Sequence, residues 1–390
     1  MSIRFTRVAA VLAGTAVMLA STVACSSERD GDSGDGAATG GTDSTATDEA
    51  PAADAGDTLV GIAMPTRSLE RWNNDGANLE TLLGDLGYET SLQYADNKVD
   101  QQITQLQNMI NQGADILVIA SIDGTALGPV LEAAAAEGIT VIAYDRLING
   151  TENVDYYATF DNYEVGQLQG QYIIDQLGLE DGEEGPFNLE PFAGSPDDNN
   201  AKFFFSGAWD LLLPYVESGV LTVPSGKAPA SNDDWTTIGI QSWESARAQS
   251  EMDNRLNSFY ADGKVDVVLS PNDSLALGIA QSLDSQGYTP GEDWPILTGQ
   301  DADLANVKNM IAGMQSMTVW KDTRTLGQQV ATMIEQIVNG EEVEVNDTET
   351  YDNGVKVVPS YLLPPQVVTP DTIEADLVES GFYDAAELGL

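Results

Sequence analysis

From residue 58 onward, short apolar runs alternate with amphipathic stretches, and this alternation restricts the chain to few folds. The clearest run is GITVIAYDRLI at residues 138–148, in which β-branched residues lie between Gly138 and a charged end. Such a run predicts a buried parallel strand. Strands that alternate with helices form a parallel sheet with helices on both faces. The sequence therefore predicts an α/β, doubly wound fold.

The alternation predicts two successive α/β units. In the first unit we expect strands at residues 59–63, 89–94, 114–120 and 138–148, and helices at 71–86, 100–112 and 126–137. In the second unit we expect strands at residues 187–192, 236–240 and 265–269, and helices at 199–213 and 245–260. The segments ADILVIASIDGTAL and VDVVLSPNDSLAL, one in each unit, resemble each other. A duplicated unit places two sets of strand ends opposite each other, and the cleft between them is the expected ligand site.

Length and charge limit the classes of function. A chain of 390 residues exceeds the size of a single hydrophobic core, so we expect two domains. Its 62 acidic and 16 basic residues give a formal net charge of -46, which disfavours nucleic acid and anionic lipid surfaces as partners. The sequence has no histidine, which excludes Ser-His-Asp and Cys-His catalysis and histidine-zinc sites.

The N-terminal residues predict export and membrane attachment. Residues 1–25 have the parts of a secretory leader, with Arg4 and Arg7 before an apolar run at 8–20. The segment TVAC that ends at Cys25 resembles a bacterial lipobox, so we expect a lipoprotein signal peptide and lipidation of Cys25. The alternative is an ordinary secreted protein whose lone cysteine lies near a different cleavage site. Residues 26–57, rich in Gly, Ser, Thr, Ala and Asp, predict a disordered acidic tether. No later apolar run reaches the ~18 residues of a membrane span, so we expect membrane contact only through the anchor.

Polar and aromatic residues lie at the loop positions that follow the predicted strands. The candidate ligand-binding residues are the acceptors Asp145, Asp198 and Asp301, the donors Arg71, Arg146 and Lys321, the amides Asn200 and Asn272, and the indole of Trp243. Sugar hydroxyls both donate and accept hydrogen bonds, and a sugar ring has an apolar face that an aromatic side chain can cover. This set therefore favours a neutral sugar as ligand. No glycine-rich phosphate loop lies between a strand and a helix, so nucleotide binding has little support.

Each candidate also has a simpler interpretation that the sequence leaves open. Asp145 and Arg146 are also suited to a local ion pair that holds a loop. One residue of each neighbouring pair also suits a helix N-cap, the pairs being Asp198 with Asn199 and Asn272 with Asp273. The remaining alternatives are core packing for Trp72 and Trp243 and simple solvation for Lys321.

Long motifs in the same order make the chain resemble a known family. They are LERW, QQITQLQNMINQGADILVIASIDG, VIAYDRLI, YYATFDNYEVG, SPDDNNAKFF, NDSLALG, TGQDADLANVKNMIAGMQSMTVWK and VPSYLLPP. With these motifs the chain resembles the periplasmic monosaccharide-binding proteins of bacterial ATP-driven importers, in the xylose-binding and multiple-sugar-binding branch. The resemblance implies a type I periplasmic binding protein with two Rossmann-like lobes joined by three hinge crossings, near Phe160, Gln300 and Lys321. It places residues 58–160 and 301–321 in an N-terminal lobe, and residues 161–300 and 322–390 in a C-terminal lobe.

The resemblance also implies a role for the candidate residues. The family's sugar contacts fall on Arg71, Asp145, Arg146, Asp198, Asn200, Trp243, Asn272, Asp301 and Lys321, with Arg67 and Trp72 as additions in the first loop. It implies a monomeric protein that is no enzyme and needs no cofactor or metal. Such a protein captures a monosaccharide of the xylose, glucose and galactose class by hinge closure, at the extracytoplasmic face of the cell membrane. It then delivers the sugar to the permease subunits of the importer.

Three other functions fit parts of the sequence. A receptor that presents sugar to a chemosensory or signalling partner is compatible with every residue named above. A glycosidase needs two carboxylates that flank the scissile bond, but pairs of acids are uninformative in so acidic a chain. A sugar-responsive transcription regulator needs a basic helix-turn-helix at the N-terminus, where this chain has a leader and an acidic tether.

Overall fold

The computed structural model describes residues 55–390, which fall in one unit of the chain, Pro51–Leu390. The predicted signal peptide, Cys25 and the tether up to residue 54 lie outside the described residues. The last three residues of the expected tether form a short 3-10 helix, Ala55–Asp57, rather than disordered chain. Within residues 55–390, no helix is both long enough and apolar enough to cross a membrane.

The first lobe contains a six-stranded sheet in the order β11-β5-β4-β3-β1-β2, and all its neighbouring strands are parallel. The strands are β1 (Leu59–Met64), β2 (Glu89–Tyr94), β3 (Ile116–Ile119), β4 (Thr140–Tyr144), β5 (Tyr156–Phe160) and β11 (Ser360–Leu363). The helices of this lobe are α1 (Glu70–Asp85), α2 (Val99–Asn111), α3 (Gly128–Ala136) and α9 (Thr323–Val338).

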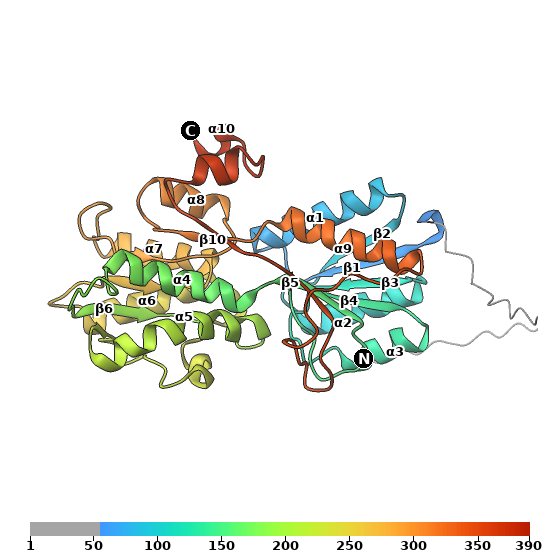
Figure 1. Ribbon diagram of the computed structural model, residues 1–390, viewed down its shortest axis with the longest axis horizontal. Coiled ribbons are helices and arrows are strands. Elements are labelled where there is room, and N and C mark those ends of the chain that lie inside the picture. Colours follow the sequence, from blue (N-terminus) through green and yellow to red (C-terminus); the bar gives the residue numbers. More distant parts are fainter. Residues whose placement is uncertain (1–54) are drawn as a thin grey trace, which may run out of the picture. The chain divides into compact units, whose positions relative to one another are not determined.

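Helices cover both faces of this sheet, as a doubly wound fold requires. Alternate residues of a strand point to opposite faces, and β4 shows the consequence. Ile142 and Tyr144 pack in the cluster that contains α1 and α9, whereas Val141 and Ala143 pack in the cluster that contains α2 and α3. Figure 1 shows the two pairs of helices on opposite sides of the sheet. The predicted fold class is therefore confirmed, and so is the buried strand at its centre.

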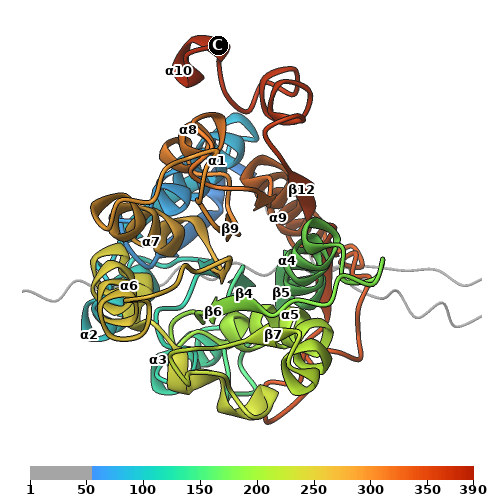
Figure 2. The same ribbon diagram turned by 90° about the vertical axis from the view of Figure 1, so that its left-hand side faces the viewer.

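The second lobe repeats the arrangement with a shorter sheet in the order β7-β6-β8-β9. Its strands are β6 (Phe187–Pro191), β7 (Leu221–Thr222), β8 (Val267–Leu269) and β9 (Ile296–Leu297). Its helices are α4 (Asn162–Leu177), α5 (Asn199–Ser218), α6 (Ser245–Phe259), α7 (Asp273–Ser285) and α8 (Leu304–Ile311). Figure 2 shows α4 and α5 on one side of β6, and α6 and α7 on the other. A two-stranded antiparallel sheet joins β10 (Thr318–Trp320) to β12 (Gln366–Val368), and the chain ends in a π-helix, η4 (Glu374–Val378), and α10 (Ala385–Leu388).

The strand expected at residues 236–240 is wrong. This segment lies at the end of the 3-10 helix η2 (Asn232–Ile238), and only a single bridge, Ala193 to Gly239, connects it to the extension of β6. Polar residues favour the turn, since the Ser231 hydroxyl hydrogen-bonds to Asp234 at 3.1 Å and the Thr237 hydroxyl donates to the Asp234 carbonyl at 2.7 Å. Local side-chain hydrogen bonds of this kind compete with sheet pairing.

The division of residues between the lobes also differs from the expectation. Residues 301–321 contain α8 and β10 and belong to the second lobe, because Gln300 forms a bridge with Val319 there. Residues 323–363 return to the first lobe, since α9 packs in its core and β11 pairs with β5. The chain passes between lobes after β5, after β10 and after β11, so no crossing lies at Gln300. The third crossing instead follows β11, where Pro364 and Pro365 interrupt hydrogen bonding between strands.

Candidate ligand-binding site

A cavity lies where the two lobes face each other, and most of the side chains that line it are buried. Ten of the eleven predicted ligand-binding residues line it, and both lobes contribute. They are Arg71, Trp72, Asp145, Arg146, Asp198, Asn200, Trp243, Asn272, Asp301 and Lys321. The structure therefore brings together side chains from positions 71 to 321 of the chain.

Arg71 holds the charged side chains of the first lobe in place. It lies in the first turn of α1, and its Nε donates to Asp75 Oδ2 at 3.0 Å, one helical turn further on. Its Nη1 lies 3.0 Å from Asp145 Oδ1 and 3.4 Å from Asp301 Oδ1, which belongs to the second lobe. Asp75 also accepts a hydrogen bond from the Tyr144 hydroxyl on β4. The guanidinium is thus fixed from behind and reaches across the cleft.

Asp145 has a strained backbone that its neighbours stabilise. It follows β4 with a φ of 59°, a left-handed conformation that costs free energy for a residue other than glycine. Its carbonyl accepts hydrogen bonds from the Tyr157 hydroxyl at 2.7 Å and the Thr159 hydroxyl at 3.0 Å, both on β5. It also accepts one from Asn200 Nδ2 of the second lobe at 2.6 Å. These donors hold the strand end in the conformation that turns the carboxylate into the cavity.

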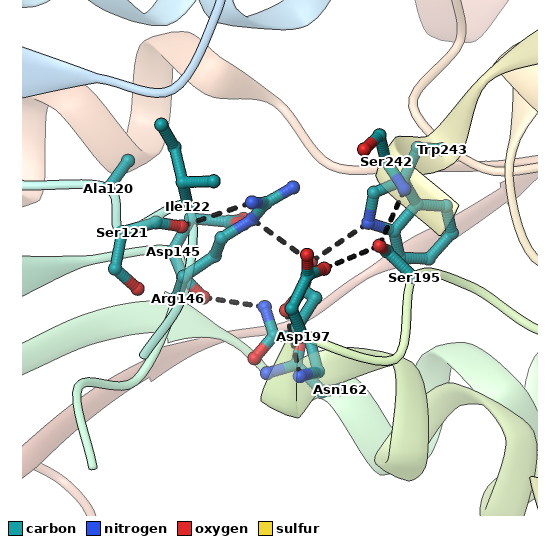
Figure 3. Close-up of polar contacts among 12 residues, drawn as sticks. Ala120, Ser121, Ile122, Asp145, Arg146, Asn162, Ser195, Asp197, Ser242 and Trp243 are labelled. Atoms are coloured by element: carbon teal, nitrogen blue, oxygen red, sulfur yellow. Dashed lines mark hydrogen bonds and ion pairs between the residues drawn. The ribbon is translucent and has the colours of Figure 1, made fainter. Parts of the chain in front are cut away.

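Arg146 and Trp243 come from opposite lobes and point toward each other across the site (Figure 3). Both contact the same carboxylate oxygen, since Arg146 Nε lies 3.0 Å from Asp198 Oδ2 and Trp243 Nε1 donates to that oxygen at 3.1 Å. Arg146 Nη1 also donates to the Ser121 carbonyl at 3.0 Å, and Figure 3 shows this contact at the end of β3. Trp243 has a φ of 56°, so its ring is also placed by a left-handed turn.

Asp301 is placed by a buried carboxylate beneath its loop. Asp301 has a φ of 101°, and the neighbouring loop is held where Asp303 N donates to Asp273 Oδ2 at 2.9 Å. Gln315 Nε2 donates to the other oxygen of Asp273 at 2.8 Å. A side chain at Gly299 would lie 2.1 Å from that same oxygen, so the loop requires glycine there. Lys321 Nζ lies 3.3 Å from Asp301 Oδ1 and 3.6 Å from Asp145 Oδ1.

Two of the simpler interpretations, helix capping and core packing, apply to residues that also line the cavity. Asp198 is the N-cap of α5 and accepts a hydrogen bond from Asn200 N at 3.0 Å, and Asn272 is the N-cap of α7 and accepts one from Leu275 N at 3.0 Å. Both residues also line the cavity. Trp72 and Trp243 each belong to a hydrophobic core and line the cavity as well, whereas Lys321 is buried rather than solvated.

The charged side chains in and near the cavity shift one another's pKa values, and the formal charges of those that line it cancel. Burial opposes ionisation of Asp145, but Arg71, Lys321 and Arg146 outweigh it and leave the pKa of its carboxyl below the ordinary value. Burial raises the pKa of Asp198, and Arg146 offsets only part of that effect. Burial also raises the pKa of Asp75 to about 6, although Arg71 acts against it. Three cationic and three carboxylate side chains line the cavity, so their formal charges cancel.

Five buried polar atoms on cavity-lining side chains have no hydrogen-bond partner among the described residues. Two of them, Asp145 Oδ1 and Arg146 Nε, lie in ion pairs. The other three are the donors Arg71 Nη2 and Trp72 Nε1 and the acceptor Gln300 Oε1. A buried polar group without a partner costs about 1–3 kcal/mol. A ligand that both donates and accepts hydrogen bonds is therefore suited to the cavity.

Three residues that line the cavity are outside the predicted set, and one predicted residue lies outside the cavity lining. Leu69, Phe204 and Gln300 line the cavity but were not among the predicted contacts. Phe204 lies one helical turn after Asn200 on α5, so helical spacing was a usable signal. Arg67 is the exception among the predicted residues, since its exposed guanidinium lies 3.8 Å from the centre of the Tyr94 ring and outside the cavity lining. Among residues 55–390, no group of three or more acidic or cysteine side chains is arranged to hold a metal ion.

Comparison with known proteins gives strong matches over most of the chain. The multiple sugar-binding periplasmic receptor ChvE of Rhizobium radiobacter is 51% identical over 340 residues, which cover 87% of this chain and 94% of that protein. The D-xylose-binding periplasmic protein of Escherichia coli is 36% identical over 337 residues, which cover 86% of this chain and 94% of that protein. The crystal structure of an ABC transporter solute binding protein from Clostridium phytofermentans with bound β-D-glucose has 52% identity and a TM-score of 0.81, and the match covers 85% of this chain and all of that one.

The family assignment follows from these matches and from a family match over residues 60–342, described as a periplasmic binding protein domain. The two lobes and the cavity between them agree with that match. The relatives are binding proteins, so the family gives the chain a binding role and no enzymatic one. The chain belongs to the periplasmic binding protein family, with sugar-binding proteins as its close relatives.

Proposed function

We propose that this chain captures a monosaccharide of the xylose, glucose and galactose class and delivers it to an ATP-driven importer. One observation carries the proposal: the cavity combines cancelled charges with buried donors and acceptors that lack protein partners. A charged ligand would disturb the balance of the three cations and three carboxylates. A neutral sugar would leave it intact, while its hydroxyls satisfy both kinds of polar atom.

Contacts between the lobes support capture by closure. Arg146 lies 3.0 Å from Asp198, and Arg71 lies 3.4 Å from Asp301, so in each pair one residue comes from each lobe. Such pairs form only when the lobes meet. A ligand that adds contacts to both lobes favours the closed arrangement by its differential affinity for that state.

Aromatic side chains support a ligand with a partly apolar face. Trp243 and Phe204 line the cavity on the second lobe, with ring centres 6.3 Å apart and ring planes at 64°. Trp72 lines it on the first lobe, where the Arg71 guanidinium lies 4.4 Å from the ring centre. One face of Trp72 is therefore occupied, and Trp243 is the better candidate for stacking on a sugar ring.

The names of the relatives support the ligand class and the place of action. One is named for multiple sugars and one for D-xylose, and the solved solute binding protein holds β-D-glucose. We extend the proposal to an extracytoplasmic protein that is lipid-anchored at Cys25 and passes sugar to permease subunits as a monomer. Because one relative is named a receptor, presentation of sugar to a signalling partner is the second candidate. Capture of either permease subunits or a sensor from membranes by the sugar-loaded protein separates the two.

Calorimetric titration of the purified chain with xylose, glucose, galactose and arabinose tests the proposal. We expect at least one sugar to bind with a micromolar Kd, which corresponds to about -8 kcal/mol. The preferred sugar also identifies the hydroxyl pattern that the site reads. Absence of heat with all four sugars would contradict the proposal.

A further inference from the structure

Outside the cavity, a second contact joins the two lobes through the C-terminal segment. Glu70 is the first residue of α1 in the first lobe, and its Oε1 accepts a hydrogen bond from Leu304 N of α8 at 3.3 Å. The Tyr383 hydroxyl donates its one proton in a shared hydrogen bond to the same oxygen at 3.2 Å and to the Ala302 carbonyl at 2.8 Å. Neither Glu70 nor Tyr383 lines the cavity. We name Glu70 and Tyr383 the outer latch.

Tyr383 belongs to the second lobe by its packing. It lies in a hydrophobic cluster with Ala302, Val307 and Met310 of the α8 region and with Ile373 and Leu377 of the C-terminal segment. Figure 1 shows the C-terminal elements beside α8. Burial, reinforced by Glu70, raises the pKa of the Tyr383 hydroxyl, so it stays protonated and able to donate. The latch is therefore a contact between lobes and not one within a lobe.

The position of the latch connects it to the ligand-binding residues. Arg71 and Asp301 meet across the cleft at 3.4 Å. Glu70 directly precedes Arg71 in the sequence, and Ala302 directly follows Asp301. Arg324 of α9 adds a second tie nearby, since its Nη1 donates to the Ser380 carbonyl at 3.1 Å. The outer latch thus holds both backbones from which the charged pair projects.

We infer that Glu70 and Tyr383 are positioning residues for ligand capture: they stabilise the closed arrangement without contact to the ligand. This inference rests on the proposed function for its effect on sugar affinity. Its effect on lobe closure is independent of any sugar. A latch that exists only between closed lobes slows ligand release, whereas a purely structural residue changes the melting temperature alone.

Tyr383→Phe tests the inference, with Tyr172→Phe as a matched control. Tyr172 also donates its hydroxyl to a backbone carbonyl, that of Ser316 at 3.0 Å, but both residues lie in the second lobe. We expect Tyr383→Phe to raise the sugar Kd about fivefold through a faster dissociation rate, as the loss of one net hydrogen bond does. Tyr172→Phe should leave Kd and both rates unchanged.

Variants at Glu70 separate the hydrogen bonds of the latch from the effect of a negative charge in the first turn of α1. Glu70→Gln keeps an oxygen that accepts both hydrogen bonds and should bind sugar like the wild type, whereas Glu70→Ala should weaken binding about tenfold. Adding Tyr383→Phe to Glu70→Ala should cause no further loss, because the two residues form one contact. Equal Kd values for the wild type, Tyr383→Phe and Glu70→Ala would overturn the inference.

X-ray scattering of the full chain without sugar tests the effect of the latch on lobe closure independently of sugar binding. We expect a larger radius of gyration for Tyr383→Phe than for the wild type and Tyr172→Phe, since loss of the latch shifts the population toward open lobes. Equal radii overturn the inference. If the wild type binds none of the sugars tested, the proposed function fails, while the scattering result still decides whether the latch closes the lobes.

Discussion

Ionisable side chains fix Arg71 of the first lobe, whereas backbone amides fix Asp198 and Asn272 of the second lobe. Arg71 is fixed by the ionisable side chains of Asp75 and Tyr144. Asp198 and Asn272 are fixed by backbone amides at the start of α5 and α7. Arg71 is therefore positioned by other ionisable groups, and Asp198 and Asn272 are positioned by the fold itself.

This difference decides which substitutions change ligand binding alone and which also change the stability of the fold. A substitution in the first lobe changes the balance of buried charges, and its effect depends on pH. A substitution in the second lobe changes a helix cap as well as a ligand contact, unless the new residue keeps the cap. The two lobes thus require different variants as tests.

The largest effect should come from Asp145→Asn. Asp145 is the carboxylate that Arg71 and Lys321 share, at 3.0 and 3.6 Å. The amide leaves both buried cations with less compensation and replaces an acceptor that a sugar hydroxyl needs. We expect sugar affinity to fall about a thousandfold, or ~4 kcal/mol, by calorimetric titration.

Asp155→Asn is the matched control for this variant. The Asp155 carboxylate accepts a hydrogen bond from Val141 N at 2.8 Å, so it serves the same strand, β4, near its beginning, away from the cavity. We expect its sugar affinity to equal that of the wild type. If Asp145→Asn binds within tenfold of the wild type, the charge network of the first lobe does not carry the binding.

The next effect concerns pH and Asp75. Burial raises the pKa of its carboxyl from 3.8 to about 6 in the folded protein. Between these pH values the unfolded chain loses the proton while the folded chain keeps it, so the stability that Asp75 contributes is full below pH 3.8 and is lost as pH rises through 6. A shift of this size corresponds to about 3 kcal/mol.

Asp75→Asn removes this titration. We expect the free energy of unfolding of the wild type, relative to the variant, to fall by about 2.4 kcal/mol from pH 4 to pH 7, measured by urea unfolding at each pH. A difference between the two proteins that does not change with pH would mean that Asp75 is already ionised in the fold at pH 4. The second lobe offers no equivalent test at Asn272, because an amide does not titrate.

The contrast also explains what the sequence could predict. The alternation of apolar runs was sufficient for the doubly wound fold and for the strand that ends at Asp145, because burial on both faces of a sheet leaves a local pattern. The 3-10 helix at residues 232–238 left no such pattern, since its turn depends on a few polar side chains. The return of residues 323–363 to the first lobe was missed because the packing of α9 against α1 and the pairing of β11 with β5 are long-range contacts.

The site residues that have a local pattern in the sequence could be predicted, and those without one could not. Polar residues directly after strands or at helix starts, such as Arg146 and Asn272, were found because parallel strands end at one edge. Gln300 has no signal of its own in the sequence, because it is an amide beside Asp301. The left-handed turns at Asp145, Trp243 and Asp301 have no glycine to reveal them in the sequence.

An intermediate effect should separate the two roles of Asp198. Asp198→Ser keeps a side-chain oxygen for the α5 cap but removes the partner of Arg146 and Trp243. We expect sugar affinity to fall about thirtyfold, or ~2 kcal/mol, with an unchanged melting temperature. Asp198→Ala loses the cap as well and should unfold about 1 kcal/mol more easily than Asp198→Ser. Equal stability of the two variants would show that the cap contributes little.

The smallest effect should come from Arg67→Ala, which tests whether Arg67 belongs to the charge network of the first lobe. The Arg67 guanidinium lies over the Tyr94 ring and makes no ion pair with the carboxylates of the cavity, whereas Arg71 makes one with Asp145 and one with Asp301. Solvent screens a charge at that position. We therefore expect a Kd within twofold of the wild type by titration, against a loss of binding in Arg71→Ala. A loss at Arg67 comparable to that at Arg71 would mean that the first loop moves toward the ligand on binding and that the network extends beyond the residues that line the cavity.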